Sequence, residues 1–256
     1  MHSLFFGDSQ KALFGIYHQP LGPNNRDVGI VLCYPGPQEY MTAHWAFRRL
    51  ADRLSKSGFH VLRFDYFGTG DSAGEGLEGN VSQWKRDVGT AVRELIDISG
   101  AKRISLVGAR LGAALAAQAA IEDIHLRDVV LWDPVINGRA YLEELKALQR
   151  HLFPSKAEEL EKNGELLGYP ISAAMATGIE EVDLLLHPPR AGERVSLVVS
   201  EERKEYLHFA ESFNSKGRML EYRLVPDFAQ WGREDLIQAS LFNNIIREIA
   251  VVLARS

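Results

Sequence analysis

The stretch Ile104–Ala113, with the sequence ISLVGARLGA, decides the fold of this chain. It joins a short apolar run to the alanine-rich helical run Ala113–Ile121 through a turn that carries Gly108 and Gly112. Glycines at this spacing let the backbone bend sharply and let a helix approach the neighbouring strands. Such a turn projects one side chain, here that of Arg110, above the edge of a sheet.

Short β-branched or apolar runs alternate with helical patterns on both sides of this turn. That alternation is typical of an α/β fold with a mostly parallel, twisted sheet and helices on both faces. The first predicted strand is a candidate for antiparallel pairing. Strands are predicted at Leu13–His18, Val28–Cys33, Phe59–Phe64, Ile104–Val107, Val129–Trp132, Val195–Val199 and Leu220–Val225, and further helices at His44–Ser57, Val81–Ser99 and Ile237–Ala254.

The length of 256 residues suits a single domain over residues 1–256. Residues 138–190 interrupt the alternation with a charged, helical pattern broken by Pro and Gly, which predicts a helical cap inserted after the sixth strand. On the helix at His44–Ser57, the helical period predicts an apolar side made of Trp45, Phe47, Leu50, Ala51 and Leu54.

Charge and cysteine content exclude several classes of function. The net charge of −5 and the absence of a basic stripe argue against nucleic acid and anionic membrane as main partners. The single cysteine, Cys33, excludes a disulfide framework, and no signal peptide or membrane span is apparent, so a cytoplasmic location is expected. No metal-ligand spacing or phosphate loop appears, so we expect neither metal nor cofactor.

Two further segments carry a family resemblance. Leu32–Tyr40 lies where an oxyanion-hole loop is expected, and Arg63–Ser72 has the form R-x-D-x-x-G-x-G-x-S. With Gly108–Gly112, the chain resembles α/β-hydrolases of the serine-aminopeptidase-like type over nearly its whole length. More narrowly, Gly36–Gln38 and Leu131–Val135 are similar to exosortase-A-system-associated hydrolases, which implies a link to exopolysaccharide or protein-sorting loci.

The resemblance implies a Ser-His-Asp triad, and the sequence departs from it at two positions. Arg110 occupies the nucleophile position, and a guanidinium is not a nucleophile. Gln230 or Ala229 occupies the histidine position. For the acid, Glu202 is the nearest match and Asp133 is a second candidate. A complete serine-type triad is therefore not expected.

The oxyanion hole is altered as well. The Leu111 N–H is expected to remain at the start of its helix, but Pro37 has no N–H, so Gln38 would supply the second donor. The candidate ligand-binding residues are Gly36, Gln38, Tyr40, Leu111, Trp132 and Trp231, with Trp45 as a further aromatic candidate for an acyl pocket.

Arg110 lies at a helix N-terminus, where a cation is unfavourable unless an anion answers it. One interpretation pairs it with an internal carboxylate, Asp133 or Glu202, which closes an inactive site. The other has its guanidinium bind a carboxylate, phosphate or acyl-thioester group of a ligand. The first is favoured because buried charges need partners and internal acids are at hand.

The other residues that could take part in catalysis are expected to have structural roles. Cys33 reads as a buried core residue rather than a nucleophile beside His44. Ser72 is expected to shape a turn. His44, His187 and His208 are expected to be surface or packing residues.

Three functions remain open. The favoured one is a non-hydrolytic pseudoenzyme that binds an acyl or anionic small molecule or serves as a pathway partner. The alternatives are an active hydrolase or thioesterase that uses water or an unusual residue, and a lyase or acyltransferase on the same scaffold. A protein partner or a homo-oligomer is left open.

Overall fold

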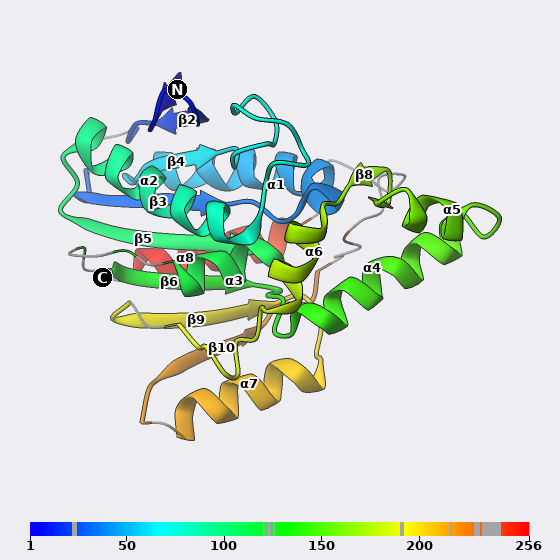
Figure 1. The fold of residues 1–256 in the computed structure, drawn as a ribbon. Coiled ribbons are helices and arrows are strands. Elements are labelled where there is room, and N and C mark those ends of the chain that lie inside the picture. The colour runs from blue at the N-terminus through cyan, green and yellow to red at the C-terminus, as the bar shows by residue number, and fades with distance from the viewer. Residues whose placement is uncertain are drawn as a thin grey trace.

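The computed structural model describes residues 1–256 except residues 22–24, 120, 122–123, 125, 190–191, 216, 228–230, 232–241 and 256. Over the described residues the main sheet has eight strands in the order β1-β2-β4-β3-β5-β6-β9-β10 (Figure 1). β1 pairs antiparallel with β2 and β2 with β4, and every other pair is parallel. The strands are β1 (His2–Phe6), β2 (Leu13–His18), β3 (Val28–Cys33), β4 (His60–Phe64), β5 (Arg103–Ala109), β6 (Leu126–Trp132), β9 (Arg194–Val199) and β10 (Leu220–Leu224).

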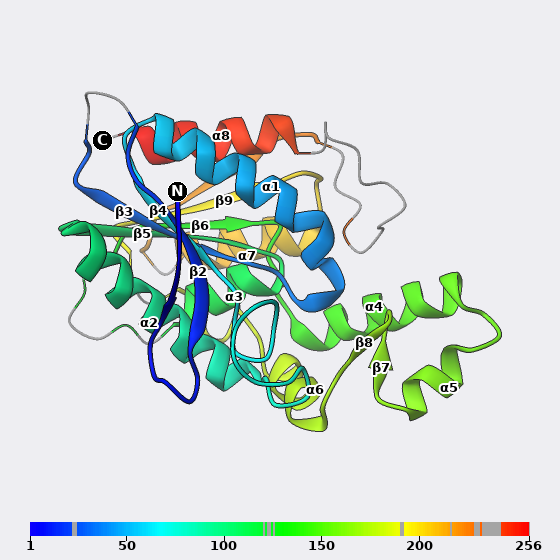
Figure 2. The same cartoon turned by 90° about the horizontal axis from the view of Figure 1, so that it is seen from above.

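Helices cover both faces of this sheet. Figure 2 shows α1 (Pro37–Lys56) and α8 (Asn243–Ala254) on one face, and α2 (Val81–Ser99) and α3 (Leu111–Gln118) on the other. α7 (Lys204–Ser215) packs against β10. The strands between the helix layers are buried on both sides: every residue of β3, β4 and β6 is buried. The mostly parallel α/β architecture predicted from the sequence is confirmed.

Most predicted elements are present, and several details differ from the prediction. α1 begins at Pro37 rather than His44, and β1 was not predicted. The prediction for Trp45 was wrong: this side chain is 53% exposed, whereas the other four predicted apolar residues of α1 are fully buried. The closing helix is described from Asn243, and its predicted first turn lies outside the described residues.

The chain between β6 and β9 forms a separate small substructure, which we call the β6–β9 segment (residues 138–189). It contains α4 (Gly138–Leu152), α5 (Ala157–Lys162), a two-stranded sheet of β7 (Glu165–Leu166) and β8 (Tyr169–Pro170), and α6 (Ala173–Glu180). The small sheet was not expected in a helical insertion. Figures 1 and 2 both show the segment extending from the end of the sheet toward which the parallel strands point.

Gly138 allows two helices of this segment, α4 and α6, to pack closely together. A Cβ at this position would lie 1.6 Å from the Ile179 carbonyl oxygen, so only glycine lets the start of α4 cross the end of α6 so closely.

Among the described helices, none is both long and apolar enough to cross a membrane.

Candidate functional site

The turn between β5 and α3 has the geometry of a nucleophile elbow. Arg110 lies at its tip with φ 51° and ψ −122°, a backbone conformation that residues other than glycine rarely adopt. A Cβ on Gly108 would lie 2.3 Å from the Gly112 carbonyl oxygen, and a Cβ on Gly112 would lie 2.1 Å from that of Tyr34. The two glycines therefore allow α3 to fold back closely over β5 and β3.

The Arg110 side chain is buried and bound by carboxylates from two other elements. Its Nε donates to Glu39 Oε1 at 2.8 Å, and the two side chains are only 3% and 1% exposed. Its Nη2 donates to both carboxylate oxygens of Glu144, each at 3.3 Å. Glu39 belongs to the first turn of α1 and Glu144 to α4. Arg110 thus links the sheet to α1 and to the β6–β9 segment.

Pairing of Arg110 with internal carboxylates was expected, but the predicted partners were wrong. Arg110 reaches Asp133 only through the backbone carbonyl, with Nη1 at 3.5 Å from it. Glu202 is exposed, and neither described ion pair of Arg110 involves it. The carboxylate of Asp133 is turned to other partners, and Glu202 lies beyond the end of β9, which leaves Glu39 and Glu144 at the guanidinium.

Tyr141 completes the surroundings of the ion pair. Its hydroxyl donates to Glu39 Oε2 at 2.8 Å, and the guanidinium carbon of Arg110 lies 5.3 Å from the centre of its ring. Burial raises the pKa of Glu39, and Arg110 and Tyr141 oppose that effect. Although burial lowers the pKa of Arg110, Glu39 and the other neighbouring groups hold it well above its usual value. The residue at the elbow is therefore a permanent cation.

Asp133, at the end of β6, occupies a site built for a carboxylate. It accepts hydrogen bonds from the Ser200 N–H at 2.7 Å, the Ser200 hydroxyl at 2.8 Å and Trp231 Nε1 at 3.1 Å. Burial raises its pKa, and the bonds from Ser200 counteract this. Gln230 lies outside the described residues, and no histidine follows His208 in the sequence. Among the described residues, the recorded side-chain partners of Asp133 are Ser200 and Trp231, and none is a histidine.

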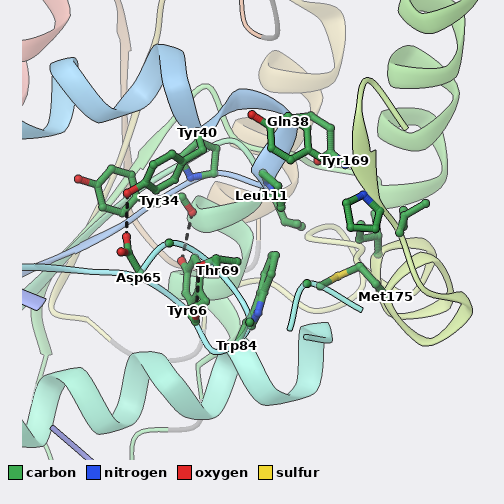
Figure 3. A pocket seen from close by; sticks show the side chains of 18 of the residues that line it. Tyr34, Gln38, Tyr40, Asp65, Tyr66, Thr69, Trp84, Leu111, Tyr169 and Met175 are labelled. Carbon is green, nitrogen blue, oxygen red and sulfur yellow. Dashed lines mark hydrogen bonds between the residues drawn. The ribbon is translucent and has the colours of Figure 1, made fainter. Parts of the chain in front are cut away.

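The predicted oxyanion loop is the beginning of α1. Gly36 is the N-cap of this helix and Pro37 its first residue, where a missing N–H costs nothing because no partner is available inside the helix. Gln38 follows in the first turn, and Leu111 is the first residue of α3. The side chains of Gln38 and Leu111 face the same cavity (Figure 3).

This cavity lies between the sheet edge and the β6–β9 segment and has a volume of about 300 Å³. Tyr40, Asp65 and Thr69 stand on the sheet side, and Met175 of α6 and Tyr169 of β8 stand opposite (Figure 3). Apolar groups dominate its wall. The described lining residues are Tyr34, Pro35, Pro37, Gln38, Tyr40, Met41, Asp65, Tyr66, Gly68, Thr69, Gly70, Gly76, Trp84, Leu111, Tyr169, Pro170, Ile171, Met175 and Ile179.

The cavity includes three of the six predicted ligand-binding residues: Gln38, Tyr40 and Leu111. Gly36 lies between two lining prolines. Trp132 and Trp231 are not among the described lining residues of this cavity: Trp132 is fully buried, and its ring packs against that of the half-buried Trp231 at 5.4 Å. Sequence reasoning missed Trp84, which lines the cavity and stacks on Tyr66 at 4.9 Å; its place on the buried face of α2 gave no sign of this.

None of the other candidate reactive side chains is among the described lining residues of the cavity. Cys33 is fully buried, and burial raises its pKa to about 12. The Ser72 hydroxyl donates to the Asp65 carbonyl at 2.6 Å and accepts from the Phe14 N–H at 2.8 Å, which fixes the turn after β4. His44 packs against Tyr34, and His187 and His208 are exposed. Among the described residues, no group of His, Cys, Asp and Glu side chains is placed to hold a metal ion.

Solved structures share this fold. An esterase from Pyrococcus furiosus has a TM-score of 0.68 at 18% identity, over 99% of this chain and 90% of that one. Est1E from Butyrivibrio proteoclasticus, solved with ferulic acid, has a TM-score of 0.66 at 13% identity, over 97% of this chain and 98% of that one. A putative hydrolase from Agrobacterium vitis has a TM-score of 0.63 at 17% identity, over 98% of this chain and 96% of that one.

Sequence comparison adds curated relatives and a family. Two proteins named acyl transferase are 28% identical, from Photobacterium phosphoreum, and 30% identical, from Photobacterium leiognathi, each over 128 residues. Each match covers 50% of this chain and 41% of the relative, so the chain spans less than half the length of these relatives. The model of the serine aminopeptidase S33 family (Hydrolase_4) matches residues 26–177. With its elbow, sheet order and this match, the chain belongs to the serine aminopeptidase S33 family of α/β-hydrolases.

Proposed function

We propose that this chain is a non-hydrolytic member of its family that binds a small molecule with an acyl or similar apolar body in the cavity beside the elbow. The observation that carries the proposal is the buried ion pair of Arg110 with Glu39 at 2.8 Å. Hydrolysis by the serine route needs a hydroxyl at this position and an imidazole to take its proton. Arg110 supplies neither, and its charge is neutralised by internal groups.

The cavity remains suited to a ligand although the nucleophile is missing. Its volume of about 300 Å³ is at the lower end of the range for small-molecule sites, and its wall is mostly apolar with a few polar groups. We further propose that the β6–β9 segment acts as the cap of this site, because Tyr169, Met175 and Ile179 come from it. The domain is one unit over residues 1–256 in this proposal, and its location is cytoplasmic.

Two measurements test the proposal. A fluorophosphonate probe is expected to leave the protein unlabelled, with an active serine esterase as the positive control. Octanamide, an eight-carbon acyl chain with an uncharged head, is expected to bind the wild type by calorimetry, and Met175→Trp, which fills the cavity, is expected to weaken this binding at least tenfold. Met219→Trp is the matched control, because Met219 is 90% exposed. Covalent labelling, or equal binding by both variants, contradicts the proposal.

Acyl transfer is the second candidate, and the similarity to two proteins named acyl transferase favours it. This candidate needs a nucleophile other than residue 110. Incubation with p-nitrophenyl octanoate followed by intact-mass measurement distinguishes the two. The non-hydrolytic proposal predicts an unchanged mass and no turnover above the uncatalysed rate, whereas acyl transfer through a covalent intermediate predicts a mass increase by one octanoyl group.

A further inference from the structure

The charge of the cavity wall is opposite to what an anionic ligand needs. Among the described lining residues, Asp65 is the only one with an ordinarily ionised side chain, and no Lys, Arg or His is among them. Burial raises the pKa of Tyr34 to about 12 and raises those of Tyr40 and Tyr66, so these phenols are neutral near pH 7. The part of the wall that the structure describes therefore offers a carboxyl group and no cation.

Arg110 does not change this balance. It is absent from the described lining, its side chain is 3% exposed, and Glu39 and Glu144 bind its guanidinium. Two other basic groups lie behind the tyrosines of the wall. Arg63 donates to Tyr34 Oη and to His18 Nε2, each at 3.2 Å, and the ring of His44 packs against Tyr34 and Tyr40.

The Asp65 carboxylate is held in place by hydrogen bonds and can still accept more of them. Its Oδ1 accepts from the Tyr40 hydroxyl at 2.8 Å (Figure 3). Its Oδ2 accepts from the Asp71 N–H at 3.1 Å. Gly70 packs directly against this carboxyl: a Cβ there would lie 2.1 Å from Asp65 Oδ2. A carboxylate has about four lone-pair positions, so two remain after these bonds. Asp65 is 6% exposed, so a polar ligand group that reaches it leaves water behind.

The rest of the wall fits an apolar chain. Leu111, Trp84 and Met175 stand across the cavity from the Asp65 end (Figure 3). Ile171 and Ile179 also line the cavity and add apolar surface. A ligand that satisfies both parts has an apolar body and a head that donates hydrogen bonds. A carboxylate or phosphate head would bring a second acceptor, usually charged, beside Asp65 with no cation among the described lining residues to balance it.

We infer that the cavity selects an amphiphile whose polar head is a hydrogen-bond donor, a primary amine or an alcohol, and that Asp65 with Tyr40 receives this head. This inference rests on the proposed function, since it concerns the ligand of the same cavity. It replaces the anionic head group considered from the sequence with a head group that donates hydrogen bonds. Tyr40 keeps the carboxyl group oriented, and the apolar wall sets the length of the chain that fits.

Calorimetry at pH 7.5 with octylamine, octan-1-ol and octanoate tests the inference, because the three probes share a chain and differ in the head. Octylamine is expected to bind at least tenfold more tightly than octanoate, with octan-1-ol between them. Asp65→Asn is expected to remove most of the preference for octylamine. Asp71→Asn, an exposed matched control that also loses one negative charge, is expected to retain it.

The outcomes separate this inference from the proposed function. Octanoate binding as tightly as octylamine overturns the donor-head inference while ligand binding in the cavity stands. Failure of all three probes to bind overturns both. The comparison of the three probes on the wild type tests the donor-head inference even if Asp65→Asn does not fold, because it measures the head-group preference without any variant.

Discussion

Glu39 in the first turn of α1 and Arg110 at the tip of the elbow form a buried ion pair, Nε to Oε1 at 2.8 Å, between residues 71 positions apart in the sequence. Tyr141 and Glu144 from α4 bind the two ends of this pair. Arg110, which stands where the sequence predicts the nucleophile position, here connects three parts of the fold. Its contribution is therefore expected to appear in stability.

Replacing Arg110 by Met is expected to destabilise the protein by about 3–5 kcal/mol, because it leaves the buried Glu39 carboxylate without its cation. The midpoint of urea denaturation measures this change. Arg203→Met is the control: Arg203 is 31% exposed and pairs with Glu201, Glu144 and Glu205, so its loss is expected to cost no more than about 1 kcal/mol.

The double variant Arg110→Met with Glu39→Gln removes both charges. It is expected to be more stable than Arg110→Met alone, because the uncompensated carboxylate is the main source of the loss. If Glu39→Gln adds a further independent loss to Arg110→Met, the two residues are not coupled as the structure shows them.

Gly112→Ala is expected to destabilise the fold more than Gly100→Ala does, although Gly112 lies inside a helix. The new methyl group of the first variant would lie 2.1 Å from the Tyr34 carbonyl oxygen. Gly100 has φ +68° with nothing within 4 Å of a Cβ, so its substitution is expected to cost about 1–2 kcal/mol of backbone strain. Thermal unfolding of the two variants compares them, and equal losses would mean that α3 can shift away from β3.

Stability is expected to decline on the acidic side through His18. Burial first, and then the charge of Arg63, lowers the pKa of His18 to about 4. In the unfolded chain this group takes up a proton near pH 6.5, so stability is present above that pH and is lost as the pH falls toward 4. His18→Gln is expected to flatten the melting temperature between pH 6.5 and 4 relative to the exposed control His208→Gln. Parallel curves for all three proteins would show that His18 does not titrate in this way.

Asp65 is expected to act in the opposite direction. Burial raises its pKa, so the folded protein holds this proton more tightly than the unfolded chain. Stability from this group is therefore greatest below the ordinary carboxyl pKa of about 3.9 and falls as the pH rises through the higher folded value. The melting temperature of Asp65→Asn minus that of the wild type is expected to increase from pH 4 to pH 7, with Asp71→Asn as control. A difference independent of pH contradicts the shift.

The elbow was predictable from the sequence, whereas the partners of its tip were not. Gly108 and Gly112 indicate the bend because their spacing, between a predicted strand and a predicted helix, can be recognised within a few neighbouring residues. Glu39 was assigned to a loop because α1 was expected to begin at His44. The Pro35-Gly36-Pro37 run does carry the start signal, since proline favours the first helical position. Glu144 lies on a segment whose placement depends on tertiary contacts, which no local pattern reports.

The cavity wall shows the same limit. Tyr40 and Leu111 were predicted from their places beside the elbow, where the family resemblance applies. Trp132 was expected there as a conspicuous aromatic at a strand end, but it is completely buried and packs at 5.8 Å against Phe47 of α1. Which side of a fully buried strand faces a cavity depends on what covers it, and alternation cannot report that when both faces are apolar.

The bend of the backbone at the end of β5 is expected to persist whatever side chain stands at its tip. Gly108 and Gly112 fix it through contacts with main-chain atoms, none of which involves the Arg110 side chain. The side chain at position 110 is therefore expected to affect the packing of other elements rather than the bend itself. Here the Arg110 side chain connects the sheet to α1 and to α4. A shorter side chain at this position is therefore expected to loosen the attachment of these two helices and to leave the bend unchanged.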